Sequence, residues 1–256
     1  MNSIRRSLRF FCAALALSYV FSAGLQSIAG PINPNQVPTL RLQIDNVPNS
    51  WNYSPAATKY RPATDADGGY ELATPEDFNV LENRAHVRIE ELQFNPDPFV
   101  LNNILVTNTT TSTQIFSAFV GLPTTFPAPN FISGNVRTSV IDGGTDGATV
   151  ATVAPTALYQ AQIDGTTVAT LQNHPFSVTA PVAGSNTLAA SFGPTVNAVP
   201  VTSNIGIQLR FSLTAGDTAA ILSRFDVTTI PEPASAALIG IGLAVIVSGA
   251  SRRRIY

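Results

Sequence analysis

Short alternating runs of apolar and polar residues, separated by turn residues, constrain the fold of this 256-residue chain most strongly. The clearest run spans residues 205–213, where an apolar residue stands at every second position from Ile205 to Leu213. A period of two places such side chains on one face of a strand. About ten runs of this kind occur, and no segment of the body has a convincing helical period. We therefore predict an all-β chain folded as an antiparallel β-sandwich.

Several of these runs are separated by typical turn residues. Asp164 and Gly165 stand between alternating residues, and this dipeptide is a strong short-range signal for a hairpin. Residues 214–217 form a turn before a final strand at 219–227. Two further pairs of runs flank polar loops and are expected to be neighbouring strands: 99–107 with 114–122, and 136–141 with 149–153.

The run that begins at residue 87 changes phase in its middle. Val87 and Ile89 share one phase, whereas Leu92 and Phe94 share the other. The extra residue falls at Glu90 or Glu91. We expect a β-bulge there, because one inserted residue moves the following side chains to the opposite face.

The body divides by composition. Residues 30–85 are rich in proline and aspartate, and we expect an irregular lead-in with one strand at 40–45 and loops over 46–77. Residues 86–229 are expected to form the sandwich core, packed with residues 37–47. Residues 1–29 and 230–256 have the character of terminal signals.

The C-terminal segment has three parts in fixed order. An apolar run of 17 uncharged residues, 234–250, extends about 25 Å as a helix, which is the short end of a membrane span. A basic cluster after the span is placed in the cytoplasm by the positive-inside rule, which leaves the body outside. We therefore expect a single C-terminal transmembrane helix. The flanking parts are Pro231, Glu232 and Pro233 before the run, and Arg252, Arg253 and Arg254 after it.

This tail resembles the PEP-CTERM sorting signal of exported bacterial proteins. The resemblance implies that a membrane enzyme, exosortase, recognises the Pro231–Glu232–Pro233 tripeptide and removes the tail. It also implies delivery to the cell surface or the extracellular matrix. An ordinary C-terminal anchor that is never cut remains the alternative.

The N-terminus has the pattern of a secretory signal helix. Three arginines between positions 5 and 9 precede an apolar run at 10–21, and Ser27 and Ala29 are small residues at the two positions that signal peptidase inspects. Cleavage after Ala29 is expected. The only cysteine, Cys12, lies within this segment, so the exported body would contain neither a disulfide nor a thiolate.

The body is acidic. Between positions 30 and 229 there are 8 basic and 15 acidic residues, a net charge of −7. Nucleic-acid binding needs a basic stripe, so we expect no nucleic-acid partner. After residue 97 the surface is polar mainly through hydroxyl and amide groups, and threonine also favours strands.

No residues have the spacing of a known catalytic or metal site. His86 and His174 lack companions, so we expect His86 on the surface, His174 in a loop, and neither a cofactor nor a metal. The segments 65–68 and 142–146 resemble calcium loops, but Thr74 and Val153 occupy the positions of the closing glutamate. Turns are the preferred interpretation.

Four aromatic residues in the proline-rich region are open to two interpretations. They could stack on sugar rings, or they could be buried at one open end of the sandwich, which is more common. Asn108 begins a formal glycosylation sequon in a threonine-rich loop. The four aromatic residues are Trp51, Tyr53, Tyr60 and Tyr70.

These observations favour an exported, non-enzymatic surface or matrix protein with a structural or adhesive role in a polysaccharide layer. Its expected partners are exosortase, signal peptidase and extracellular polysaccharide. The alternative is a carbohydrate-binding module without catalysis. A hydrolase with an unrecognised site is the third hypothesis.

Overall fold

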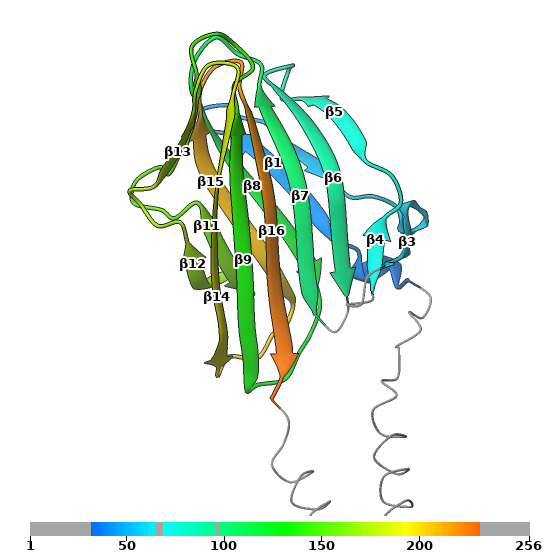
Figure 1. The fold of residues 1–256 in the computed structure, drawn as a ribbon. Coiled ribbons are helices and arrows are strands. Elements are labelled where there is room, and N and C mark those ends of the chain that lie inside the picture. Colours follow the sequence, from blue (N-terminus) through cyan, green and yellow to red (C-terminus); the bar gives the residue numbers. More distant parts are fainter. Residues whose placement is uncertain (1–31, 65–68, 96–97, 231–256) are drawn as a thin grey trace, which may run out of the picture.

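The computed structural model describes residues 32–64, 69–95 and 98–230, which form two packed antiparallel sheets (Figure 1). The predicted all-β antiparallel sandwich is confirmed. The helices in the described ranges are two short 3₁₀ turns, η1 (Pro34–Gln36) and η2 (Ala57–Lys59). None of these described helices has the length and apolarity needed to cross a bilayer, and the span expected at 234–250 lies outside the described residues.

Each sheet contains eight strands, and every pairing is antiparallel. Sheet A runs in the order β12 (Thr166–Leu171), β11 (Tyr159–Ile163), β15 (Asn204–Leu213), β8 (Gln114–Pro123), β1 (Thr39–Ile44) and β2 (Ser50–Tyr53), with β10 (Ala148–Ala151) paired to β15 and β13 (Ser177–Ala180) paired to β10. Sheet B runs in the order β14 (Ser185–Asn197), β9 (Asn130–Ile141), β16 (Thr218–Thr229), β7 (Phe99–Asn108), β6 (Ala85–Asn95), β4 (Tyr70–Leu72) and β3 (Tyr60–Pro62), with β5 (Glu76–Val80) paired to β6.

The core lies between the sheets and is built by the alternating residues. In β15 every second residue from Ile205 to Leu213 is fully buried, as the period of two predicts. Phe116 of β8 stacks on Phe211 of β15, with ring centroids 5.7 Å apart. Phe225 of β16 reaches the core from sheet B. The remaining alternate positions face outward, where polar residues are mixed with apolar ones such as Leu101 and Leu222 of sheet B.

A hydrogen bond between a side chain of sheet A and the backbone of sheet B crosses the core. The hydroxyl of Tyr159, at the start of β11, donates to the carbonyl oxygen of Arg224 in β16 at 2.9 Å. Tyr159 is fully buried. Gly134 of β9 makes room for this bond, because a Cβ atom there would lie 2.7 Å from the Tyr159 hydroxyl and 2.9 Å from the Arg224 carbonyl. The burial of the phenol raises the pKa of Tyr159, so it stays protonated and donates.

Two local predictions are confirmed. The register of β6 against β7 shifts between Ile89 and Glu91, which is the expected bulge. Asp164 and Gly165 join β11 to β12 with positive φ angles of 50° and 77°, as a type I′ hairpin turn requires.

The two predicted pairs of neighbouring strands are wrong. β7 and β8 lie in different sheets, and so do β9 and β10. Alternation shows which face of a strand is buried, but a strand of either sheet has the same pattern. The five- and six-residue loops between these strands are long enough to cross the top of the sandwich in Figure 1.

The irregular loops predicted over residues 46–77 are also wrong. This segment contains β2, β3, β4 and the start of β5, which extend both sheets. The strands are only three to five residues long and are interrupted by prolines, so no alternation is visible in the sequence. The single strand predicted at 40–45 corresponds to β1.

A pair of tyrosine variants tests the bond between the sheets. Tyr159→Phe should lower the free energy of unfolding by about 1–2 kcal/mol, because a buried acceptor loses its donor. Tyr60→Phe is the matched control, since the buried Tyr60 hydroxyl has no hydrogen-bond partner within the described residues. The control should be neutral or stabilising in urea denaturation. Equal losses in both variants would contradict the assignment.

Candidate functional site

The residues of the predicted sorting signals lie outside the described residues. These are Ser27 and Ala29 at the N-terminus, and Pro231, Glu232, Pro233, Arg252, Arg253 and Arg254 at the C-terminus. The last strand, β16, ends at Thr229, directly before the tripeptide.

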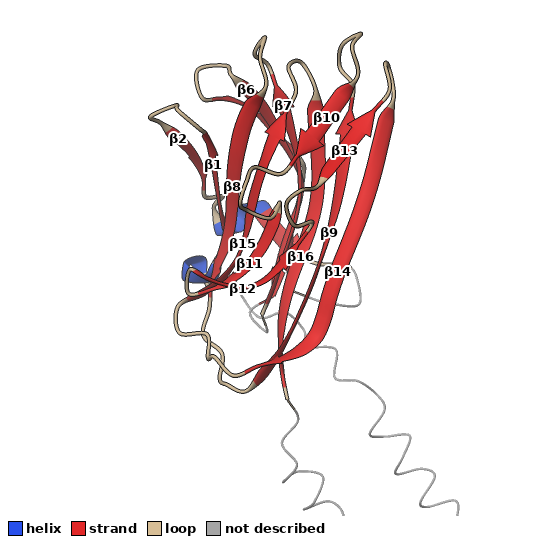
Figure 2. Cartoon of the chain, turned by 90° about the vertical axis from the view of Figure 1, so that its left-hand side faces the viewer, coloured by secondary structure: helices blue, strands red, loops and turns tan. Residues whose placement is uncertain are grey.

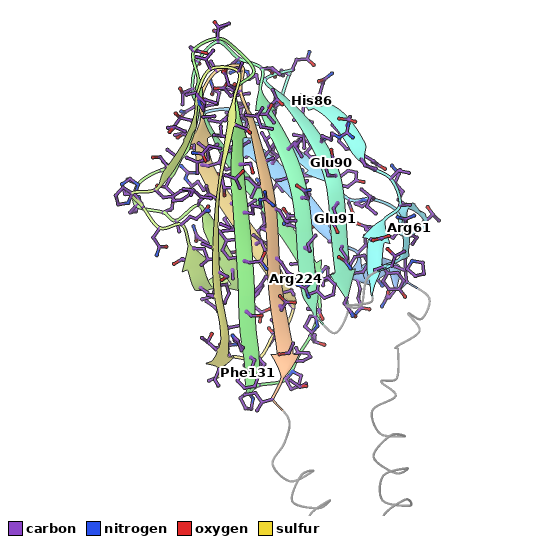
Figure 3. All side chains as sticks on the ribbon, in the orientation of Figure 1. Arg61, His86, Glu90, Glu91, Phe131 and Arg224 are labelled. Atoms are coloured by element: carbon purple, nitrogen blue, oxygen red, sulfur yellow. The ribbon has the colours of Figure 1, made fainter. Side chains whose placement is uncertain are left out.

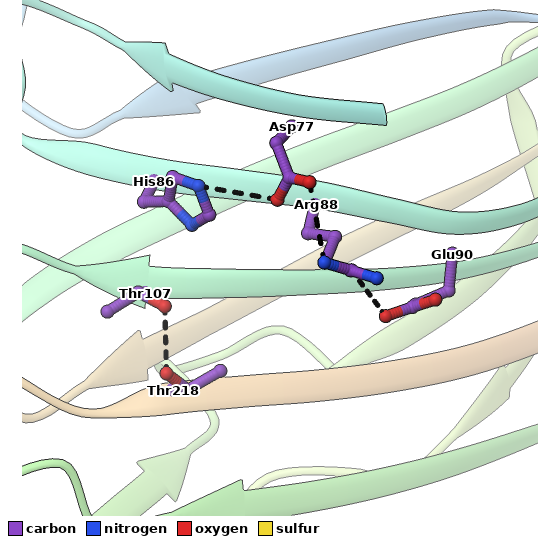
Figure 4. Close-up of polar contacts among 6 residues, drawn as sticks. All are labelled: Asp77, His86, Arg88, Glu90, Thr107 and Thr218. Carbon is purple, nitrogen blue, oxygen red and sulfur yellow. Dashed lines mark hydrogen bonds and ion pairs between the residues drawn. The ribbon is translucent and has the colours of Figure 1, made fainter. Parts of the chain in front are cut away.

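The two histidines occupy the places that the sequence predicts. His86 lies on the outer face of β6, with its Nε2 atom 3.4 Å from Asp77 Oδ1 (Figure 4). The Arg88 guanidinium lies 3.4 Å from the Asp77 carboxylate and 2.5 Å from the Glu90 carboxylate. The hydrogen bond to Glu90 raises the pKa of Arg88. His174 lies in the loop before β13. The described residues contain no group of three or more candidate metal ligands.

Charged side chains line the outer face of sheet B. Figure 3 shows His86, Glu90, Glu91 and Arg224 along this face. The Arg224 guanidinium binds Asp226 at 2.7 Å and lies 4.4 Å from the centre of the Phe99 ring. His86, Glu90 and Arg224 are paired with neighbours on the same sheet, as on an ordinary solvated face.

The second calcium-like segment, residues 142–146, lies in the loop that connects β9 of sheet B to β10 of sheet A, and hydrogen bonds hold its backbone. The carboxylate of Asp142 accepts hydrogen bonds from the backbone N–H groups of Ala183 at 2.6 Å and Gly144 at 3.2 Å. The bond from Ala183 holds the pKa of Asp142 below its ordinary value, against the opposing effect of burial. Asp217 accepts from Gly143 N–H at 3.1 Å. Both carboxylates thus stabilise loop backbone. The other calcium-like segment, residues 65–68, lies outside the described residues.

The Asn108 side chain is also a structural element. It is fully buried, and its amide donates to the carbonyls of Ser112, Leu213 and Thr214 at 2.8–3.0 Å. Its oxygen accepts from Thr110. The nitrogen that a glycan would modify is therefore inaccessible in the folded protein, which rules out the sequon as a site on the folded body.

The four aromatic residues of the proline-rich region pack into the body. Tyr53, Tyr60 and Tyr70 are buried, and Trp51 is half-buried. Trp51 and Tyr53 contact Phe78 of β5 at ring distances of 5.0 and 5.2 Å, which joins the edges of the two sheets. Burial and the hydrogen bond to Glu76 raise the pKa of Tyr53. These rings are part of the hydrophobic core, and the sugar-stacking interpretation does not hold for the three buried tyrosines.

A hollow of about 350 Å³ lies on the outer face of sheet A. It is at the lower end of the range of ligand pockets, roughly 300–1,000 Å³. Three strand ends and the β11–β12 turn surround it. Its lining consists of Thr39 of β1, Phe119, Gly121 and Pro123 of β8, Asp164 and Gly165 of the turn, and Asn204 of β15.

Phe119 is an outward-facing aromatic ring that lies along the sheet. A Cβ atom at Gly121 would stand 2.6 Å from its Cε1 atom, and one at Gly206 would stand 2.7 Å from its Cε2 and Cζ atoms. The far edge of the ring therefore fills the space that two side chains would need. The two glycines are paired across β8 and β15, so together they form a flat seat for the ring.

Hydrogen-bonding side chains flank this ring. The register places Arg41 of β1 and Gln208 of β15 directly beside Phe119, and Gln162 of β11 beside Gly206. Arg41 is exposed and the two glutamines are half-buried. The ring thus lies among amide and guanidinium groups, a combination that offers apolar contact and hydrogen bonding to the same ligand.

Asp164 fixes one wall of the hollow. Its carboxylate accepts five hydrogen bonds of 2.7–2.9 Å from the backbone and hydroxyl groups of Thr202 and Ser203 and from the backbone of Asn204. Burial alone raises the pKa of Asp164, but these hydrogen bonds, led by that of Thr202, outweigh it and hold the pKa well below its ordinary value. The carboxylate is therefore a fixed, ionised anchor for the β14–β15 connection.

Sequence reasoning missed this site. The available signal was an aromatic residue at an outward position of β8 and a glycine at an outward position of the alternating run in β15. Neither is unusual alone. Their meaning depends on the β8–β15 register, which pairs Gly121 with Gly206, 85 positions away, and is not visible in a single sequence.

The comparisons with known proteins bear mainly on the C-terminus. A model of the PEP-CTERM protein-sorting motif matches residues 229–254, which include the predicted tripeptide and all three arginines. The chain carries a PEP-CTERM protein-sorting motif. This motif implies an exported, transiently membrane-anchored protein that is sorted by exosortase.

The other comparisons are with curated proteins and with solved structures. No curated protein resembles the chain closely enough to count as a match. One solved structure similar to the chain is that of TmCBM61 in complex with beta-1,4-galactotriose, with 12% sequence identity over 67% of this chain and 88% of that chain and a TM-score of 0.24. A likeness at this TM-score carries no argument about what the body binds.

Acid should weaken the fold through Asp164. Because its pKa is lower in the folded protein than the ordinary value of about 3.9, the unfolded chain takes up a proton first. The stabilisation is complete above about pH 4 and is lost as the pH falls through the lowered folded value. Urea midpoints measured between about pH 7 and pH 2 should fall accordingly.

Two asparagine variants isolate this effect. Asp164→Asn should lower the urea midpoint at neutral pH and flatten its decline in acid. Asp146→Asn, at an exposed loop position, should keep the behaviour of the unmodified protein. An unchanged acid profile in Asp164→Asn would show that this carboxylate does not set the pH dependence.

Proposed function

We propose that the protein is a non-catalytic adhesive component of an extracellular polysaccharide layer, and that its body binds glycan on the outer face of sheet A. The observation that carries this proposal is the Phe119 ring seated on Gly121 and Gly206 within the hollow. An aromatic ring that lies over two glycines on an outer sheet face offers apolar contact to the apolar face of a sugar ring.

The polar groups around the ring suit the rest of a sugar. Hydroxyl groups of a glycan both donate and accept hydrogen bonds, and the amides of Gln162 and Gln208 do the same. Arg41 adds donors on the other side of Phe119. The open position of the hollow on a sheet face would let a chain continue in both directions, which suits a polymer better than a small free ligand.

The arrangement of carboxylates supports binding without catalysis. Glycoside hydrolysis canonically needs two carboxyl groups on either side of the scissile bond, one of them able to give up a proton. Asp164 is the only carboxylate among the residues that line the hollow. It is held by five hydrogen bonds and its pKa is lowered, so it is a poor proton donor.

The sorting motif supports an exported location for this function. We propose that signal peptidase cuts after Ala29, and that exosortase cuts near Glu232 while residues 234–250 span the membrane with Arg252–Arg254 in the cytoplasm. The body would then be released from its own membrane anchor into the layer that it binds.

Loss of the aromatic ring tests the binding face. Phe119→Ala should weaken retention in native gels that contain soluble polysaccharide by about tenfold, because a lost aromatic contact of about 1.4 kcal/mol corresponds to that factor. Phe131→Ala is the matched control, since it removes a half-buried phenylalanine from the outer face of sheet B (Figure 3). Equal retention of Phe119→Ala and the unmodified protein, across a panel of neutral and acidic polysaccharides, would refute the site.

Tail processing is tested at the C-terminus itself. Mass spectrometry of the protein from cells should find the tail absent in the unmodified protein and retained in Glu232→Ala. Ser235→Ala, three residues further on, is the control and should still be processed. Arg252–Tyr256 present on the unmodified protein would make the tail a permanent anchor.

A further inference from the structure

The outer edge of sheet B differs from every other sheet edge among the described residues. β14 is the outermost strand of that sheet and pairs only with β9 (Figure 2). It is 13 residues long, which corresponds to about 40 Å of strand. The other edge strands, β2, β3, β5, β12 and β13, have three to six residues.

This edge carries no charge. The sequence contains no Asp, Glu, Lys or Arg from residue 165 to residue 209, and this range includes the whole of β14. The opposite edge of sheet B has an Arg61–Glu71 ion pair at β3 and β4, and Glu76 and Asp77 in β5. Charged side chains on edge strands are a common device that prevents pairing with another chain, and β14 lacks it.

Exposed apolar side chains gather along the same edge. Five large apolar residues are exposed in the described part of the chain, and all five lie in β14, beside it, or opposite its first residue. Single exposed apolar residues are ordinary, but their confinement to one edge marks an interaction site. They are Ile141 (40% exposed), Val182 (57%), Leu188 (45%), Val196 (65%) and Val199 (52%).

The geometry of β14 suits one partner in particular. Residues 185–192 pair with β9 without interruption, and the register shift at Gly193 and Pro194 affects only the remainder of the strand. An uninterrupted antiparallel strand can pair with its own copy about a twofold axis, because the two directions are then automatically opposed. A charge near such an axis would face its own copy, and β14 has none.

We infer that β14 is a self-association edge, at which two copies of this chain pair antiparallel and join their B sheets into one continuous sheet. The backbone groups of residues 185–192 that do not pair with β9 supply the hydrogen bonds. The Thr187 N–H group donates to Asn186 Oδ1 at 2.8 Å in the single chain, so this side chain has to turn away when the copies pair. Leu188, Val196 and their neighbours supply apolar contact. The outer faces of the A sheets remain free in this pair, so each dimer would present two copies of the Phe119 face.

The test is the mass of the full chain in detergent solution, measured by sedimentation and light scattering. The unmodified protein should be a dimer at about 100 μM, and the dimer fraction should fall on dilution. Leu188→Lys should convert it to a monomer, because two lysines would face each other near the axis. Ala189→Lys, at an exposed position inside the uninterrupted segment, is a second edge variant, useful if Leu188→Lys fails to fold as judged by circular dichroism.

Asn103→Lys is the matched control. It adds the same charge to the outer face of sheet B, on β7 and three strands away from β14 in the sheet order, and it should leave the dimer intact. A monomeric unmodified protein would overturn the inference. Dimers that persist in both folded edge variants would also overturn it, as would loss of the dimer in Asn103→Lys.

Discussion

The buried hydrogen bond from Tyr159 to the Arg224 carbonyl, together with that from Thr138 to Gln172, holds the two sheets against each other. The Tyr159 bond crosses the core between a strand of sheet A and a strand of sheet B, and it is possible only because Gly134 has no side chain. Tyr159 begins β11, which pairs with β15, and β15 in turn pairs with β8. β15, which carries Gly206 beneath the Phe119 ring, is therefore paired with β11, whose Tyr159 is hydrogen-bonded across the core.

Polar side chains at the top of the sandwich hold the connections between the sheets. Asn108, Asp142 and Asp217 each satisfy backbone groups of a different loop, so four crossing connections form one network. A buried amide or carboxylate that loses its partners is costly, which makes this network specific to one arrangement. The sequence suggests a glycan acceptor at Asn108 and a calcium loop that begins at Asp142, and the structure shows that both side chains stabilise the crossings.

The sequence predicts the features that depend on near neighbours. The alternation in β15, the bulge at Glu90–Glu91 and the Asp164–Gly165 turn are all local, and all are confirmed. The pairing of strands depends on residues far apart in the chain. The strands that flank the loops 109–113 and 142–147 are therefore predicted as neighbours, although they lie in different sheets. The Phe119 face cannot be predicted for the same reason, because the ring lies over Gly121 and Gly206 only when β8 and β15 are paired.

The most direct test of the glycan-binding face is the side-chain amide signals of the protein in nuclear magnetic resonance during titration with oligosaccharides. Our account predicts that the signals of Gln162 and Gln208 shift on addition of a bound glycan. The signals of Asn103 and Asn135, on the outer face of sheet B, should stay in place. Shifts confined to sheet B, with Gln162 and Gln208 unchanged, would contradict the account.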